Sequence, residues 1–233
     1  LHDFILHSLV AGPPGEFWQY NNTASILLGW IVEQKTNQSL SEMAQTFFFN
    51  PLNMNQTTFT PKKLITSIID QQTKIAPSEH DEWRNGDVLA EVHDESAWVL
   101  SQKYGAVGSA GLFSTATDLA KFLVMLLQQG RVEETTIFEP NTIKKLQQPR
   151  QLENGQLVGL GWEWAPSSWA GTSISPTTIG KTGFTGCSVT VDWEKRIGVV
   201  ILSNATYPQR PSNRAALNTF RAPLDLAQYP RPG

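Results

Sequence analysis

The stretch GKTGFTGCSVTVDW, residues 180–193, constrains the fold of this chain more than any other segment. Its second half alternates apolar and polar residues, the period of a half-buried β-strand, with Cys187, Val189, Val191 and Trp193 on one side and Ser188, Thr190 and Asp192 on the other. A second apolar run, 197–203, follows the polar residues 194–196, so the two runs predict an antiparallel hairpin. Gly183 and Gly186 weaken a strand unless another group approaches the backbone closely. Beside Lys181, they therefore predict a site that holds an anionic group.

Helical periodicity dominates the part of the chain before this hairpin. Apolar residues at 24, 27, 28 and 31 recur at helical spacing, with Asn22 or Thr23 as the expected cap. Ser39 and Glu42 have the spacing of a capping box at the start of the next helix. Further helices are expected over 115–130, 140–146 and 212–228, and a further strand over 157–164. We expect an α+β fold, with a mostly helical part over 1–154 and the sheet with a C-terminal helix over 155–233.

Composition and missing motifs exclude several classes of function. A net charge of -3 provides no basic field for nucleic acid, and the apolar runs are too short for a transmembrane segment. The absence of HExxH, CxxC, GxGxxG and GxxxxGK[ST] weighs against metal-dependent hydrolysis and nucleotide chemistry, and that of GxSxG against an α/β-hydrolase. The single cysteine, Cys187, is interpreted as a core residue rather than a nucleophile.

Two short motifs remain that could carry chemistry, Lys181-Thr182-Gly183 and Tyr20-Asn21-Asn22. Taken alone, each has a structural alternative, a solvated lysine at a strand end and an aromatic side chain at a rim. Their flanks change the interpretation. PPGEFWQYNNTASILLGW, GSAGLFSTATDLAKF, GLGWEW and GKTGFTG with VDWEKRIGVVILSN follow one another in an order that resembles the serine hydrolases of the class C β-lactamase and penicillin-binding protein superfamily. The resemblance covers most of residues 11–221 and includes carboxypeptidase-like and esterase-like members.

The resemblance implies a fold, a mechanism and a set of site residues. The fold is an antiparallel sheet flanked by helices plus a mostly helical region, with the family's N-terminal strands missing here. A serine attacks an amide or ester carbonyl and forms an acyl-enzyme, without metal or cofactor. The implied catalytic residues are Tyr20 as general acid and base, Asn22 and Lys181, and the implied substrate-binding and oxyanion residues are Thr182, Gly183 and Phe184. The implied substrates are a D-alanyl or peptidoglycan-like peptide, a β-lactam or a small ester, met outside the cytoplasm or at the cell envelope.

The chain departs from the family at the nucleophile, because Ser-x-x-Lys occurs nowhere in it. Three explanations stay open: the sequence lacks segments, the serine lies on another fragment or chain, or the protein is a natural non-catalytic relative. That relative would bind a peptide carboxylate at Lys181 and Thr182 without turnover. His93 and Asp94 are interpreted as a structural pair that anchors a loop, with a position at the rim of the active site as the alternative.

Overall fold

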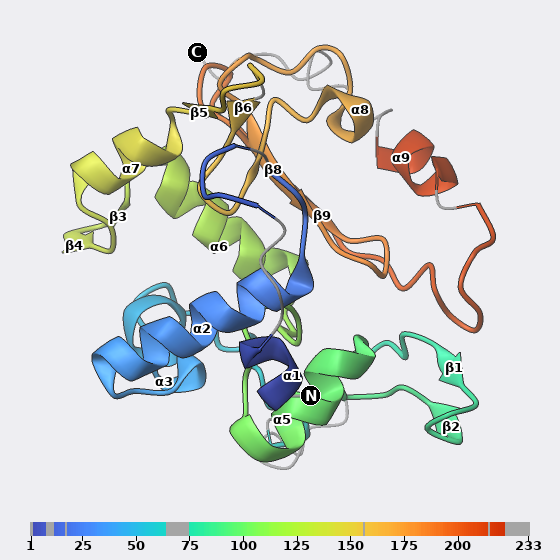
Figure 1. Ribbon diagram of the computed structural model, residues 1–233. Helices are drawn as coiled ribbons and strands as arrows, with labels where there is room; N and C mark the ends of the chain where they lie inside the picture. The colour runs from blue at the N-terminus through green and yellow to red at the C-terminus, as the bar shows by residue number, and fades with distance from the viewer. Residues whose placement is uncertain are drawn as a thin grey trace. The chain divides into compact units, whose positions relative to one another are not determined.

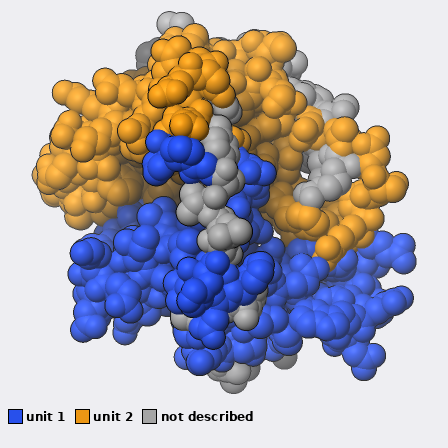
Figure 2. Space-filling model, in the orientation of Figure 1, with its two compact units in different colours: residues 1–14, 19–115, 207–209 blue, residues 15–18, 116–206, 210–233 orange. Residues whose placement is uncertain are grey.

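A computed structural model describes residues 2–7, 12–16, 18–63, 75–155, 157–213 and 215–221 (Figure 1). The chain divides into two units, which Figure 2 shows in different colours. Unit 1 contains residues 1–14, 19–115 and 207–209, and unit 2 contains residues 15–18, 116–206 and 210–233.

Unit 1 is mainly helical in its described residues. Its helices are α1 (His2–Leu6), α2 (Asn22–Thr36), α3 (Leu40–Ala44), the π-helical turn η1 (Gln45–Phe49) and α5 (Glu95–Tyr104). A short antiparallel pair, β1 (His80–Asp81) and β2 (Gly86–Asp87), precedes α5. The buried core of this unit joins α1, α2, α5 and the loop after α5 through Ile5, Ile26, Ala97, Leu100 and Val107.

The ends of α2 and α3 show why these residues form helices. The cap of α2 is Asn21, whose Oδ1 accepts a hydrogen bond from the Thr23 N–H at 2.7 Å, so the expected cap at Asn22 or Thr23 was wrong by one or two positions. The predicted capping box at α3 is confirmed, because Ser39 and Glu42 each accept the other's backbone N–H. Both caps satisfy donors that a helix start leaves unpaired.

Unit 2 contains the main sheet and the helices that pack on it. Its helices are α6 (Ala116–Leu127), α7 (Pro140–Leu146), α8 (Ser167–Ala170) and α9 (Ala215–Arg221). Its short strand pairs are β3 (Arg131–Val132) with β4 (Thr135–Thr136), and β5 (Arg150–Gln151) with β6 (Leu157–Val158). The four-stranded sheet contains β7 (Glu163–Trp164), β8 (Ile179–Thr182), β9 (Ser188–Asp192) and β10 (Ile197–Ile201) in the order β10-β9-β8-β7.

All neighbouring strands of this sheet are antiparallel, and the predicted hairpin is confirmed as β9 and β10. Its register places Asp192 opposite Ile197 and Ser188 opposite Ile201. Figure 1 shows β8 and β9 running side by side, as their ladder requires. Helices and an antiparallel sheet together make the α+β fold that the sequence predicts.

The two faces of the sheet are covered by different helices. On one face, Gly198 lies so close to α6 that an added Cβ would come 3.0 Å from the Leu123 Cβ. On the other face, the ring of Trp169 from α8 lies over Gly180 of β8. Because both faces are covered, the polar side of β9 is buried too, with Thr190 only 5% exposed and Asp192 fully buried. The expectation of a half-buried strand was therefore wrong for β9, because its polar side is buried as well.

One further expectation needs correction, and another is observed in part. The single strand predicted over 157–164 is two short strands, β6 and β7, separated by a bend. Gly161 has a φ of +79°, and a Cβ at Gly159 would lie 2.6 Å from the Trp162 carbonyl oxygen, so this backbone cannot continue as a straight strand. The helix predicted over 212–228 is observed as α9, and residues 222–228 lie outside the described residues.

Candidate active site

The Lys-Thr-Gly motif lies where β8 extends past its neighbour. Strand β7 pairs with β8 only through Glu163 opposite Gly180 and Trp164 opposite Ile179. Lys181 and Thr182 continue the ladder with β9 alone, opposite Val189 and Ser188. On the β7 side, the ladder therefore ends before the motif begins.

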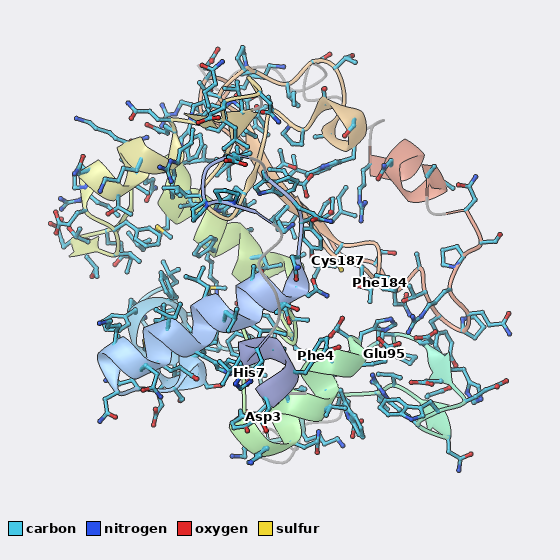
Figure 3. The ribbon with its side chains drawn as sticks, viewed as in Figure 1. Asp3, Phe4, His7, Glu95, Phe184 and Cys187 are labelled. Atoms are coloured by element: carbon cyan, nitrogen blue, oxygen red, sulfur yellow. The ribbon has the colours of Figure 1, made fainter. Side chains whose placement is uncertain are left out.

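A tight turn follows the motif and joins β8 to β9. The Gly183 N–H donates to the Cys187 carbonyl at 2.7 Å, and the Gly186 N–H donates to the Gly183 carbonyl at 3.2 Å. Figure 3 labels Phe184 and Cys187 on this turn, and Phe184 is 42% exposed. Since backbone donors alternate sides along an antiparallel strand, the Thr182 N–H faces away from β9. The motif thus carries a main-chain N–H that faces away from β9, at Thr182, next to the lysine at position 181.

A buried arginine from α9 holds this turn in place. The Arg221 Nη2 donates to the carbonyl oxygens of Cys187 at 2.9 Å and Gly183 at 3.3 Å, and its Nη1 donates to the Asn218 Oδ1 at 3.1 Å. The residue is only 6% exposed. Charge-assisted hydrogen bonds of this kind are stronger than neutral ones. Arg221 therefore fixes both ends of the segment that carries Phe184.

The acidic residue Glu163 contacts both polar side chains of the motif. Its Oε1 lies 3.5 Å from the Lys181 Nζ and 3.5 Å from the Thr182 Oγ1. Its Oε2 accepts a hydrogen bond from the Trp169 Nε1 at 2.7 Å. The Trp169 ring in turn requires a glycine at position 180, because a Cβ there would lie 2.5 Å from the Trp169 Cη2. The first glycine of GKTG is thus explained by the tryptophan that holds Glu163.

The Tyr-x-Asn motif lies in unit 1, at the start of α2. Tyr20 immediately precedes the cap residue Asn21, and the residue is 59% exposed. Asn22 is the first residue of α2, and its Nδ2 donates to the Asp94 Oδ2 at 3.3 Å. Asp94 also caps α5, because its Oδ1 accepts the Ala97 N–H at 2.8 Å. The amide of Asn22 is therefore positioned by the cap of another helix.

His93 and Asp94 have different partners. The His93 Nδ1 lies 2.9 Å from the Ser78 Oγ, and its Nε2 lies 3.4 Å from the Glu79 Oε2. This arrangement is the loop anchor that the structural interpretation expects of His93. Asp94 instead contacts Asn22, which belongs to the predicted site.

The structure thus groups the predicted site residues in two places. Lys181, Thr182, Gly183 and Phe184 follow one another from β8 into its turn in unit 2. Tyr20 and Asn22 flank the cap of α2 in unit 1. Sequence reasoning named Asp94 only in a structural pair with the rim of the active site as its alternative role, and it missed three residues that hold these groups, namely Glu163, Trp169 and Arg221. Glu163 belongs to the GLGWEW motif, but no sequence signal links Trp169 or Arg221 to a motif that lies 12 or more positions away.

Within the described residues, no group of three or more His, Cys, Asp and Glu side chains could hold a metal ion. Among the helices of the described ranges, none is both long and apolar enough to cross a membrane.

Comparison with known proteins identifies the family of this chain. The family model described as Beta-lactamase matches residues 1–222. A Salmonella schwarzengrund protein provisionally named a D-alanyl-D-alanine carboxypeptidase is 28% identical over 218 residues, which cover 89% of this chain and 50% of that protein. The chain therefore spans about half the length of this curated relative.

Solved structures agree with the family match. The octameric penicillin-binding protein homologue from Pyrococcus abyssi has a TM-score of 0.60 and 25% identity, covering 90% of this chain and 43% of that one. EstCE1, a hydrolase with promiscuous acyltransferase activity, has a TM-score of 0.58 and 21% identity, covering 89% of this chain and 56% of that one. With a family match over nearly its whole length and the fold of these relatives, the chain belongs to the β-lactamase family.

Proposed function

We propose that this protein is a serine hydrolase that cleaves an amide or an ester through an acyl-enzyme. The observation that carries the proposal is the Lys-Thr-Gly segment of β8, which extends past the end of the β7 ladder. Lys181 and Thr182 lie on this segment and Phe184 on the turn after it, where an extended acyl donor could lie along the backbone. The proposed substrates are a D-alanyl peptide, as the name of the Salmonella relative suggests, a β-lactam or a small ester.

In the proposed mechanism, Lys181 and Thr182 bind a carboxylate of the substrate, and the chemical steps fall to the serine, Tyr20 and the oxyanion donor. The serine hydroxyl attacks the carbonyl carbon while Tyr20 accepts its proton, and Tyr20 then donates that proton to the leaving group. Asn22, oriented by Asp94, binds an amide of the substrate. The Phe184 N–H donates a hydrogen bond to the oxyanion. Removal of one such donor typically raises the activation barrier by about 3 kcal/mol. Water then hydrolyses the acyl-enzyme and releases the acid.

The nucleophile is the part of this proposal that the 233 residues do not supply, since they contain no Ser-x-x-Lys. The proposal therefore requires that a serine from outside these residues completes the site. The same absence favours a second candidate, a non-catalytic relative that binds a peptide carboxylate at Lys181 and Thr182. An esterase of the same fold would use the mechanism of the first proposal on a different substrate.

The decisive experiment uses the protein expressed from its complete reading frame. Intact-mass spectrometry after incubation with a penicillin should show a stoichiometric penicilloyl adduct. A Tyr20→Phe variant should hydrolyse an activated ester 10²- to 10⁴-fold more slowly, the usual contribution of a general acid or base. Tyr207→Phe is the matched control, because the Tyr207 hydroxyl donates to Asp87 at 3.1 Å and the proposal gives it no role. If Tyr20→Phe kept the wild-type rate, or if the protein bound substrate without any turnover, the hydrolase proposal would be rejected in favour of the non-catalytic binding protein.

A further inference from the structure

The groups that the proposed function assigns to a substrate carboxylate already contact a carboxylate of this chain. Glu163 Oε1 lies 3.5 Å from both the Lys181 Nζ and the Thr182 Oγ1. Its side chain is 34% exposed and that of Lys181 is 37% exposed, so both border on solvent, from which a substrate would come. The positive charge of Lys181 is thus balanced before any substrate arrives.

A hydrogen bond and the strand pairing of its backbone fix the position of Glu163. Its Oε2 accepts the Trp169 Nε1–H at 2.7 Å, and Trp169 is only 5% exposed. If the carboxylate swung away, this buried N–H would lose its acceptor, which is unfavourable. The backbone of Glu163 is also fixed, because it pairs with Gly180 across the β7–β8 ladder.

We infer that Glu163 is a specificity-determining residue that selects uncharged esters or amides over substrates with a carboxylate next to the scissile bond. The inference rests on the proposed function, because it concerns the same site. A substrate carboxylate at Lys181 and Thr182 would lie within a few ångströms of the Glu163 carboxylate, and two like charges at that distance repel each other. An ester or amide group at the same place can accept a hydrogen bond from Thr182 without that repulsion.

Other cations near the turn do not remove this repulsion. Arg221 donates to the carbonyls of Gly183 and Cys187 and to Asn218. Arg210 lies over the Phe184 ring, with its Cζ 5.2 Å from the ring centroid. Neither contact is with the Glu163 carboxylate, so of these cations only Lys181 pairs with Glu163, and a ligand carboxylate would compete with Glu163 for it.

The test compares two thioesters that differ in one group, N-acetyl-D-alanyl-thioglycolate and its methyl ester, with the protein from the complete reading frame. Glu163→Gln removes the charge and keeps the shape and an oxygen acceptor for Trp169. We expect wild type to prefer the methyl ester. The variant should raise kcat/KM for the free carboxylate at least tenfold while changing that for the methyl ester less than threefold. An unchanged ratio of the two values would overturn the inference.

The matched control is Glu194→Gln in the turn between β9 and β10. Glu194 is exposed, accepts from the Thr177 Oγ1 at 3.1 Å, and lies five residues along the chain from Val189, about 15 Å by strand geometry. Its substitution should leave the substrate ratio unchanged. If Glu194→Gln shifts the substrate ratio as much as Glu163→Gln does, the net charge of the protein explains the effect and the specific role of Glu163 is rejected.

A binding experiment separates this inference from the proposed function. Calorimetric titration with N-acetyl-D-alanine and with its methyl ester needs no turnover. Glu163→Gln should increase the affinity for the acid at least tenfold relative to that for the ester, and an equal change for both ligands would overturn the inference. If wild type turns over neither thioester, the proposed function fails, and the titration still decides the role of Glu163.

Discussion

The Asn22 Nδ2 donates to the Asp94 Oδ2 at 3.3 Å and thereby joins the first residue of α2 to the cap of α5. The other oxygen of the same carboxylate accepts the Ala97 N–H at 2.8 Å. One side chain thus completes a helix start and orients an amide of the candidate site. These two roles can be separated by substitution.

Asp94→Ser should lower the rate of hydrolysis strongly and change the free energy of unfolding little. A serine can cap α5 but is too short to reach Asn22, so we expect at least a tenfold loss in kcat/KM with less than about 1 kcal/mol lost from the free energy of unfolding. Asp94→Ala removes both roles and should cost about 1 kcal/mol more. Ester hydrolysis and urea unfolding measure the two effects. A serine variant with full activity would show that Asn22 needs no orienting partner.

Gly108→Ala should destabilise unit 1, because α2 packs directly on the backbone of this residue. An added Cβ would lie 2.1 Å from the Ser25 carbonyl oxygen, so the loop and α2 would have to separate. Overpacking of this kind costs about 1–3 kcal/mol. Gly86→Ala is the control, since no atom lies within 4 Å of its added Cβ and its φ is not positive. Equal thermal midpoints for the two variants would contradict the close packing.

Arg221→Lys should impair the turn that carries Phe184. A lysine keeps the charge but cannot donate in a fork to the Gly183 and Cys187 carbonyls and to Asn218 at once. Because the turn positions the proposed oxyanion donor, we expect kcat to fall at least tenfold with a smaller change in KM. Arg150→Lys, at an exposed position in β5, should leave both parameters unchanged. A fall in stability with kcat intact would limit Arg221 to a structural role.

Asp192→Asn should remove part of the pH dependence of stability. Burial opposes ionisation of this carboxyl, but hydrogen bonds from the backbone N–H groups of Lys195 and Ser175 outweigh it and lower the pKa of Asp192. Its contribution is therefore present above the unfolded pKa, about 3.9, and is lost as the pH falls through the lower folded value.

The measurement is urea unfolding of both proteins between pH 7 and pH 3. We expect Asp192→Asn to be about 1–3 kcal/mol less stable at pH 7 and the difference to shrink below about pH 4. Glu153→Gln, which removes an exposed carboxylate, should give no such trend. If the difference in unfolding free energy between wild type and Asp192→Asn stays constant from pH 7 to pH 3, the loss of stability comes from the changed shape of the side chain and not from its charge.

Local patterns in the sequence predict much of this structure. Alternation over 187–193 and the polar residues 194–196 predict the β9–β10 hairpin, and Ser39 with Glu42 predicts the capping box of α3. Both features depend on residues that are close in the sequence, and their physics is therefore readable from short windows. The order of the motifs, with Tyr20 and Lys181 among them, indicates the family that the comparison confirms.

The tertiary structure alone decides which residues hold the site. Asp94 meets Asn22 across 72 positions, and Arg221 meets Gly183 across 38. No local pattern records such contacts, because they depend on how separate elements pack. The same applies to Glu163, which contacts Lys181 and Thr182 because the β7–β8 register and the Trp169 indole place its carboxylate there. The sequence alone determined which polar groups the Lys-Thr-Gly motif carries, and packing decided that these groups face the Glu163 carboxylate.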